Sequence, residues 1–493
     1  MPTDIYQEPL VSRYTSKAMQ HIFSDDFKFQ SWRKCWTALA EAEMELGLKD
    51  ANGNPRITRA MIDELVAAQS TIDYGIANAE EKKRRHDVMA HVYEYGTHCP
   101  TAKGIIHLGA TSMFVGDNTD LIQMREATAI IRKGLINVIY NLSEIADANK
   151  DLACLGYTHY QPAQPTTMGK RFTLYIQDLL MDLELINSLK FRARGAKGTT
   201  GTQASYMELF DGDYEKVKAL DQLVSEKLGF DSSFDVTGQT YTRKFDTIVA
   251  GVMAGVAVSL KKFATDIRLL SNQKCVDEPF EVDQTGSSAM AYKRNPMRSE
   301  RMTSLSRLVM SRINDYYGTA ADQWFERTLD DSAIRRMVIP QTFLGTEAIL
   351  ILANNITNRN VNPETTRPMT FYHKRIARLL NDELQFSATE AILMDLAKQG
   401  YDRQAMHELI QTHSVASSNA MKEEGTDNTL FERLTADDKF PLDAEELDAY
   451  LIDPLRFTGA ASQQTSEYLQ QLVRPILEKN ADLIGKSEGR VNV

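Results

Sequence analysis

The sequence contains few cysteines and no grouped metal ligands. Only 4 of its 493 residues are cysteine, and they lie far apart with no C-x-x-C or cysteine–histidine ligand spacing. This pattern predicts buried free thiols in a reducing compartment rather than disulfides. No metal-ligand cluster appears in the sequence. The four cysteines are Cys35, Cys99, Cys154 and Cys275.

The chain also lacks a basic excess, a secretory signal and a long apolar run. Its net charge of −11 argues against a general nucleic-acid binder, so an anionic substrate would need a local positive pocket. The start MPTDIYQEPL has no basic stretch followed by apolar residues. The uncharged run 247–260 is shorter than the roughly 20 residues that span a bilayer. We therefore expect a cytoplasmic protein with neither nucleic acid nor a membrane as partner.

Helical periodicity dominates what is present. Between residues 121 and 145, eight positions follow one another at spacings of three and four, and seven of them are apolar. Helical patterns return over 172–186, 248–270, 296–313 and 343–356, and glycine- and proline-bearing segments separate them. Because 248–270 is uncharged as far as residue 260 and rich in small residues, we expect that half to be buried on nearly all sides. No run of alternating strands is evident.

These patterns predict an all-α fold with three regions. Residues 1–111 form an N-terminal helical domain with a helix over 31–46, and residues 112–362 form a central bundle of long helices. Residues 363–493 form a C-terminal domain of shorter helices, including 371–381 and 388–397. A chain of this length, 43 % apolar and 25 % charged, is large enough for two or three domains.

One polar stretch, 286–300, interrupts the bundle with the sequence GSSAMAYKRNPMRSE. Gly286 suits a folded loop, Ser287 offers a hydroxyl, Lys293 a positive charge and Asn295 an amide. Such groups can hold a carboxylate-rich substrate and move a proton beside it. On composition alone, a polar linker between two helices is the competing interpretation.

Several motifs together resemble the fumarase/aspartase superfamily. They are RHDVMAH (85–91), GIIHLGATS (104–112), GYTHYQPAQPTT (156–167), KGTTGTQAS (197–205), TGQTYTRK (237–244), GSSAMAYKRNPM (286–297) and QWFERTLDDSAIRR (323–336). The similarity is strongest to the branch that acts on succinylated purine nucleotides. Ala291 stands where the superfamily usually has proline, which leaves the loop less stiff.

The resemblance implies a three-domain all-α fold with a long-helix bundle that builds a homotetramer core, and active sites shared between subunits. It implies cofactor-free release of fumarate from adenylosuccinate and from succinylaminoimidazole-carboxamide ribotide (SAICAR). Two alternatives stay open, namely another fumarate-releasing lyase of the superfamily and a non-catalytic, crystallin-like scaffold. Intact Ser287, His159 and Lys293 argue against the scaffold.

Carried over by position, the resemblance assigns Ser287 as general base, with Lys293 as the charge that helps to deprotonate it. His159 matches the general acid for the leaving nitrogen, although a lone histidine among aromatic residues is more often structural. The resemblance also implies that His86 orients the site and that Glu300 holds His159 in position. The alternative for His86 is a structural pair with Asp87, and the alternative for Glu300 is a favourable charge at the start of a helix.

The remaining matched positions bind substrate. Arginine suits phosphate geometry, and the competing interpretation of these arginines is surface ion pairing with acids such as Asp330 and Asp331. His107 would support the network around His86. The matched positions are Arg13, Tyr14, Arg85, His86, Asp87, Thr111, Ser112, Thr158, Gln239, Asn295, Arg301, Arg327, Ser332 and Arg336.

Overall fold

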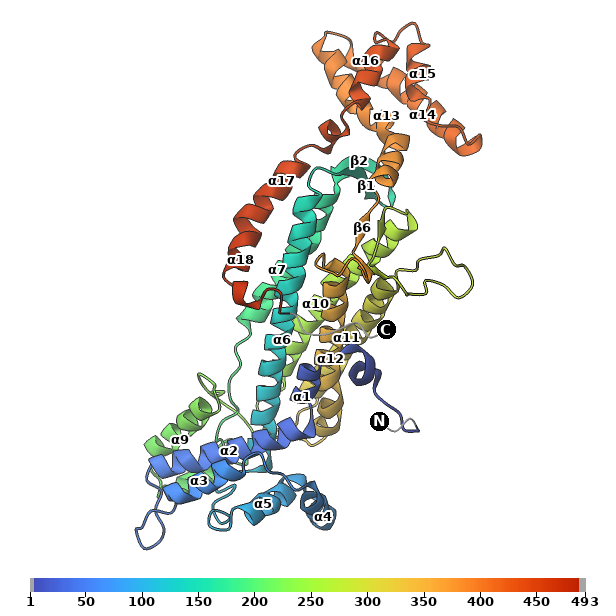
Figure 1. Ribbon diagram of the computed structural model, residues 1–493. Coiled ribbons are helices and arrows are strands. Elements are labelled where there is room, and N and C mark those ends of the chain that lie inside the picture. The colour runs from blue at the N-terminus through green and yellow to red at the C-terminus, as the bar shows by residue number, and fades with distance from the viewer. Residues whose placement is uncertain (1–3, 487–493) are drawn as a thin grey trace.

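Five long helices form the centre of the molecule in the computed structural model, which describes residues 4–486 (Figure 1). They run side by side along the long axis, and the all-α, long-helix fold predicted from the sequence is confirmed. The five are α6 (Ser112–Ala148), α7 (Met168–Ser188), α10 (Lys244–Asn272), α11 (Met297–Ala321) and α12 (Asp331–Thr357).

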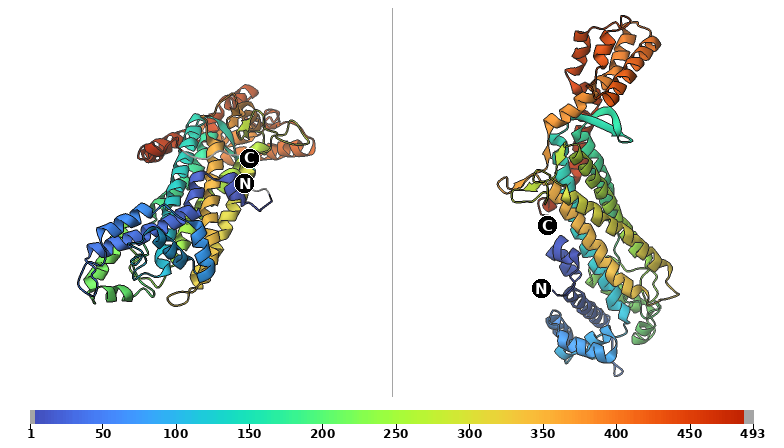
Figure 2. Two further views of the ribbon diagram at one scale, coloured as in Figure 1. Left: turned by 60° about the horizontal axis from the view of Figure 1, so that its bottom comes forward. Right: turned by 90° about the vertical axis from the view of Figure 1, so that its right-hand side faces the viewer.

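Shorter helices lie at the two ends of this bundle and along its sides, where α17 packs against α7 and η1 and α1 pack against α12 (Figures 1 and 2). At the N-terminal end lie η1 (Leu10–Tyr14), α1 (Lys17–Ile22), α2 (Asp25–Glu45), α3 (Arg59–Ala68), α4 (Tyr74–Arg84), α5 (Asp87–His98), α8 (Ala204–Leu209) and α9 (Tyr214–Lys227). The C-terminal part contains α13 (His373–Lys398), α14 (Arg403–Glu423), α15 (Leu430–Thr435), α16 (Ala444–Asp448), η2 (Ala449–Leu451), η3 (Pro454–Thr458), α17 (Ala461–Tyr468), η4 (Leu469–Val473), α18 (Arg474–Glu478) and η5 (Ala481–Leu483).

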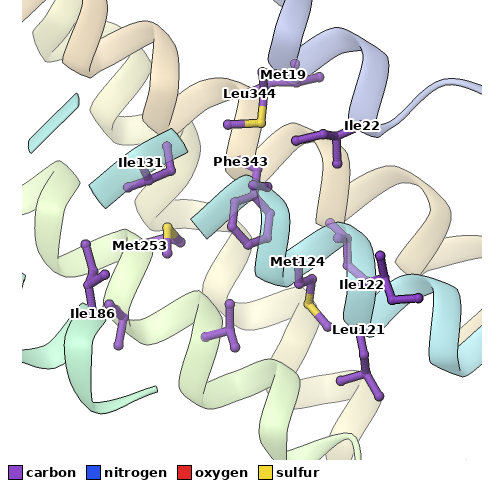
Figure 3. Packing of buried hydrophobic residues seen from close by; sticks show 14 of the residues in the cluster. Met19, Ile22, Leu121, Ile122, Met124, Ile131, Ile186, Met253, Phe343 and Leu344 are labelled. Carbon is purple, nitrogen blue, oxygen red and sulfur yellow. The ribbon is translucent and has the colours of Figure 1, made fainter. Parts of the chain in front are cut away.

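Helix α6 is the axis of the core. All eight positions of its predicted seam are buried, from Leu121 to Ile145. Helix α6 packs against α7, α12 and α2, and Figure 3 shows Met124 beside Phe343 and Ile131 beside Met253. Burying each such side chain contributes on the order of 1.5–3 kcal/mol, so this seam fixes the length and direction of the bundle.

Helix α10 differs from the expectation of burial on nearly all sides. Ile248 is 49 % exposed and Val258 is 51 % exposed in the single chain. Helix α7 likewise exposes Leu174, Met181 and Leu185. By length and composition α10 and α12 could cross a membrane, but 61 % and 78 % of their apolar windows are buried inside the fold, as in core helices of water-soluble folds.

Three small antiparallel sheets interrupt the helices. The hairpin β1 (Ala153–Thr158) with β2 (Gln161–Thr167) extends beyond the far end of α6. The other two sheets pair β3 (Val276–Asp277) with β6 (Thr370–Phe371) and β4 (Phe280–Glu281) with β5 (Thr366–Arg367). The expectation of two helices over 371–381 and 388–397 is wrong, because α13 is continuous from His373 to Lys398.

The apolar core forms two main clusters. The larger unites α2, the five long helices and the returning C-terminal residues Leu469 and Val473. The second lies within α13–α16, around Ile392, Leu430 and Leu434. The division into domains 1–111, 112–362 and 363–493 stays a prediction.

Candidate active site

One group of the predicted residues meets at the end of the bundle where α6 begins. His86 caps α5 through its Nδ1, which accepts from the Met89 N–H at 3.3 Å. A neutral ring therefore carries its proton on Nε2, which lies 3.2 Å from the Ser112 Oγ. His86, the N-cap of α5, and Ser112, the first residue of α6, are 26 residues apart in the sequence and are joined by this contact.

Gln239 joins a second trio in the same place. Its Nε2 donates to the Thr111 Oγ1 at 3.3 Å, and its Oε1 accepts from Arg327 Nη1 at 2.9 Å. Buried Arg194 donates to the Gln239 carbonyl at 2.8 Å, which fixes the backbone of this segment. Thr111, Gln239 and Arg327, three of the predicted substrate-binding residues, thus contact one another in the structure.

The phosphate-type residues line a cleft of about 1070 Å³ beside this group. Arg336, 64 % exposed, donates to Asp87 at 3.2 Å across the cleft. Ser332 lies one turn earlier on α12, and Arg85 lines the opposite side. Arg85 has φ 55°, a left-handed conformation that ends α4 and turns the chain toward His86.

A buried charge network lies directly beneath the cleft. Arg335 donates to Asp246 at 2.8 Å, to Asp120 at 2.7 Å and to the Tyr241 hydroxyl at 2.6 Å. Arg243 pairs in the same way with Asp117 and Asp331, both at 2.9 Å. These contacts join α6, α10, α12 and the segment before α10, so they hold the cleft walls at fixed spacing.

His107 supports the site from behind. Its Nδ1 accepts from the Trp36 Nε1–H at 2.8 Å. Burial, aided by the nearby His86, lowers the pKa of His107 to about 4, so the ring is neutral near pH 7. Gly109, two residues on, has φ +65°, and a Cβ there would lie 2.7 Å from the Tyr206 ring. The chain can therefore reach Thr111 and Ser112 only with glycine at this point.

His159 lies elsewhere, at the tip of the β1–β2 hairpin. Thr158 pairs with Gln161, which makes His159 and Tyr160 the two central residues of the turn, with φ of 52° and 58°. Hairpin turns of this kind favour asparagine and glycine, and each bulky residue there is strained by roughly 1–2 kcal/mol. The fold thus presents an exposed histidine at a strained turn, which is typical of a functional position.

Ser287, Lys293 and Asn295 lie in a third place, the loop 282–296, which we call the signature loop. Figure 1 shows it projecting from the bundle. The Ser287 Oγ accepts from the Ala289 and Met290 amides at 3.4 and 3.2 Å, and Asn295 donates to the Gly286 carbonyl at 3.1 Å. Lys293 is exposed, and no hydrogen bond to Ser287 is formed within the described residues.

The signature loop is firmly held at both ends. The Glu278 carboxylate accepts from the Arg298 and Ser299 amides at 2.8 and 3.0 Å, which caps α11. At the other end, the Val282 amide donates to the Thr365 carbonyl at 3.0 Å. Movement is therefore confined to the residues between these anchors.

The remaining predicted residues lie outside the cleft lining. Arg13 and Tyr14 are on η1, which packs against α12. Glu300 and Arg301 occupy the first turn and a half of α11, and Glu300 is exposed. Glu300 forms no hydrogen bond with His159 within the part of the chain that the structure describes. No group of three side chains among residues 4–486 is arranged to hold a metal ion.

The length of α6 separates these groups within one chain. Its 37 residues rise about 1.5 Å each, so Ser112 and the hairpin beyond Ala148 are about 55 Å apart. The signature loop lies before the N-terminal end of α11, and Arg327 lies beyond its C-terminal end. The 25 residues of α11 rise about 1.5 Å each, so α11 separates the two by about 37 Å. A single chain therefore cannot place Ser112, His159 and Ser287 around one small molecule.

Some cleft residues were not found by sequence reasoning. Lys28 and Trp32 of α2 line the cleft, as do Asp120 and Asp331. Trp32 lies in the helix predicted over 31–46, where an apolar residue is expected in the core. Its burial fits a core residue and a cleft-lining residue equally well. Asp331 was considered only as a surface partner for arginine, whereas it is buried and paired with Arg243. No local motif predicts such long-range pairs.

Comparison with solved structures agrees with this architecture. A 3-carboxy-cis,cis-muconate lactonizing enzyme from Pseudomonas putida superposes with a TM-score of 0.78, at 23 % identity, covering 95 % of this chain and 99 % of that one. A fumarate lyase from Mesorhizobium gives 0.76 at 20 % identity, covering 95 % and 100 %. At these identities the likeness concerns the fold. The family model described as "Lyase" matches residues 9–311. The family model covers more than half of the chain, which is therefore a lyase of the fumarase/aspartase superfamily.

Sequence comparison narrows the class further. A model described as "Adenylosuccinate lyase C-terminus" matches residues 385–468. The adenylosuccinate lyase of Saccharomyces cerevisiae is 47 % identical over 99 % of both chains, and that of Schizosaccharomyces pombe is 47 % identical over 96 % of this chain and 95 % of its own. The enzyme of Schistosoma mansoni is 43 % identical over 97 % of both. The chain belongs to the adenylosuccinate lyase family.

Proposed function

We propose that this protein releases fumarate from adenylosuccinate to give AMP, and from SAICAR to give the corresponding carboxamide ribotide, without a cofactor. The observation that carries the proposal is the pairing of two features in one cleft. Arg327, Ser332 and Arg336 offer a phosphate grip, and His86 with Ser112 lies beside it. A lyase acting on fumarate, aspartate or argininosuccinate has no phosphate to bind.

The first chemical step is removal of a proton from the succinyl carbon beside a carboxylate. Ser287 is the proposed base. Serine is a poor base, but the two amides that donate to its Oγ stabilise negative charge on that atom. Lys293, six residues along the same loop, adds positive charge on loop closure.

In the second step the electron pair left on the succinyl carbon forms the double bond of fumarate, and the electron pair of the broken carbon–nitrogen bond leaves with the nitrogen of the nucleotide. His159 donates a proton to that nitrogen, held in orientation by Glu300 and by the strained hairpin turn. Thr111, Ser112, Thr158 and Asn295 hold the succinyl carboxylates. Gln239 contacts the base or the carboxylate region, Arg301 reaches the nucleotide, and Arg85 and Asp87 contact the substrate from the cleft. The phosphate lies against Arg327, Ser332 and Arg336, and the resemblance adds Arg13 and Tyr14, which lie outside this cleft in one chain.

Turnover of purified protein with adenylosuccinate, followed by absorbance and by fumarate release, tests the activity. Equal amounts of AMP and fumarate, without added metal or cofactor, are expected. No turnover in a folded tetramer, but turnover of another succinyl or malyl compound, would favour a different lyase of the superfamily. Inactivity on all of these would favour the scaffold interpretation.

We further propose a homotetramer whose active sites are each shared between subunits. The three residue groups are separated by about 55 and 37 Å within one chain, so other copies must complete each site. The exposed apolar residues of α7 and α10, such as Met181 and Val258, provide the faces through which copies associate.

Mixing two inactive variants tests this sharing. His159→Asn and Ser287→Ala chains, reassembled in equal amounts, should recover about a quarter of wild-type activity if a site takes these residues from different copies, because each residue is intact with a chance of one half. Recovery of no activity in tetramers shown to be mixed would place both residues in one chain.

We also propose a soluble, cytoplasmic enzyme, in keeping with four buried free cysteines.

A further inference from the structure

The loop between α11 and α12 carries an unusual exposed apolar group. Trp324 is 70 % exposed, Phe325 is 101 % exposed and Leu329 is 71 % exposed. Isolated exposed apolar residues are common, but three of them within six positions mark a contact surface. We call residues 322–330 the aromatic loop.

The aromatic loop is tied to the candidate active site. The Gln239 amide donates to the Glu326 carbonyl at 3.0 Å, and Arg327 donates to the Gln239 side chain. A Cβ on Gly238 would lie 2.4 Å from the Glu326 oxygen, so glycine permits this approach. Directly before these anchors, Phe325 has φ 44°, which is strained for a bulky residue. The backbone thus holds the ring out into solvent at the rim of the site.

The signature loop carries a matching apolar group. Val282 is 68 % exposed, Met290 50 % and Tyr292 84 %. The two loops lie at opposite ends of α11, about 37 Å apart, so they cannot meet within one chain. The proposed function nevertheless requires the signature loop of another copy to deliver Ser287 to the Gln239–Arg327 corner, where the aromatic loop begins.

We infer that the aromatic loop is the docking platform on which the signature loop of a second copy closes, with Trp324 and Phe325 receiving the partner chain's apolar loop residues. This inference rests on the proposed function. Two α11 helices lying antiparallel about a twofold axis would place each signature loop beside the other chain's aromatic loop, twice per pair. Docking would exclude water from the base and hold the loop closed during proton removal.

Removal of the Phe325 ring tests the docking through kinetics. In Phe325→Ser, kcat should fall by about tenfold to a hundredfold, the factor that corresponds to losing one buried aromatic contact. AMP affinity should be unchanged, because Arg327, Ser332 and Arg336 remain. Tyr214→Ser, at an exposed tyrosine of α9, is the matched control and should behave as wild type. An unchanged kcat in Phe325→Ser would overturn the inference.

Cross-linking tests the contact itself. The double variant Tyr292→Cys/Phe325→Cys, treated with a short bismaleimide in the presence of AMP and fumarate, should give covalent dimers of chains, since the four native cysteines are buried. Tyr292→Cys/Tyr214→Cys is the control. Cross-linking at the control level, in a protein whose wild type is active on adenylosuccinate, contradicts the docking alone. A wild type without turnover contradicts the proposed function instead.

Discussion

Substitution by methionine should have different effects at Arg335 and Arg336, two adjacent residues of α12: a loss of stability at Arg335 and a higher KM at Arg336. Arg335 is 5 % exposed and forms three charge-assisted hydrogen bonds of 2.6–2.8 Å, whereas Arg336 is 64 % exposed and forms one at 3.2 Å. Arg335→Met leaves the buried carboxylate of Asp246 and the partly exposed carboxylate of Asp120 without their cation. Breaking a buried pair in this way costs about 3–5 kcal/mol. Arg336→Met removes an exposed pair worth at most about 1 kcal/mol.

Denaturant unfolding of both variants under identical conditions gives the comparison, with the slope checked against wild type. Arg335→Met should lose most of the stability, and Arg336→Met should instead raise the KM for adenylosuccinate through loss of the phosphate grip. Adding Asp120→Asn to Arg335→Met should recover part of the loss, because it removes one of the orphaned charges. Equal stabilities of the two single variants, or a loss below about 1 kcal/mol in Arg335→Met, would refute this account of the buried network.

Three further outcomes are expected. Ser287→Ala should lose turnover in a fumarate-release assay while keeping AMP binding and tetramer mass by light scattering; near-normal turnover would remove Ser287 as base. Burial raises the pKa of Glu43, whose two carboxylate oxygens have no hydrogen-bond partner. Above the ordinary pKa range of glutamate, the folded state therefore keeps a proton that the unfolded state releases. The free energy of unfolding then falls as the pH rises, by at most about 1.4 kcal/mol per pH unit. Glu43→Gln should therefore be more stable than wild type at pH 8 but not at pH 4, by thermal unfolding, and an equal difference at both pH values would contradict the burial argument. Gly109→Ala should destabilise by about 1–3 kcal/mol in denaturant, because its Cβ collides with the Tyr206 ring, and no loss would show that the ring gives way.

The long helices could be predicted because their apolar spacing is local information. The same spacing also marks α13 as one helix, since Leu380, Leu384, Ala388 and Ile392 follow at intervals of four and are all buried. The prediction of two separate helices overlooked this apolar spacing, which continues across the polar residues between 381 and 388. Lack of charge in α10 was a weaker guide, because it signals burial in an assembly as readily as burial within one chain.

The site could be predicted as a set of residues but not as a geometry. The motifs identified Ser112, His159 and Ser287 as candidate site residues. Only the lengths of α6 and α11 show that these residues are far apart within one chain. The buried network escaped prediction because its pairs, such as Arg335 with Asp120, are 215 residues apart.

Backbone strain follows the site rather than the connections in general. Of the eight non-glycine residues with positive φ in the described chain, Arg85, His107, His159, Tyr160 and Phe325 belong to segments assigned to the site or its rim. At roughly 1–2 kcal/mol each, these five together oppose folding by an amount comparable with the net stability of many domains. Only a large rigid core can hold them, and the long buried seam of α6 with the charge network at its end supplies one. The bundle therefore both separates the groups of candidate site residues and holds the strained segments in one conformation, which lowers the reorganisation that the proposed catalysis would otherwise need.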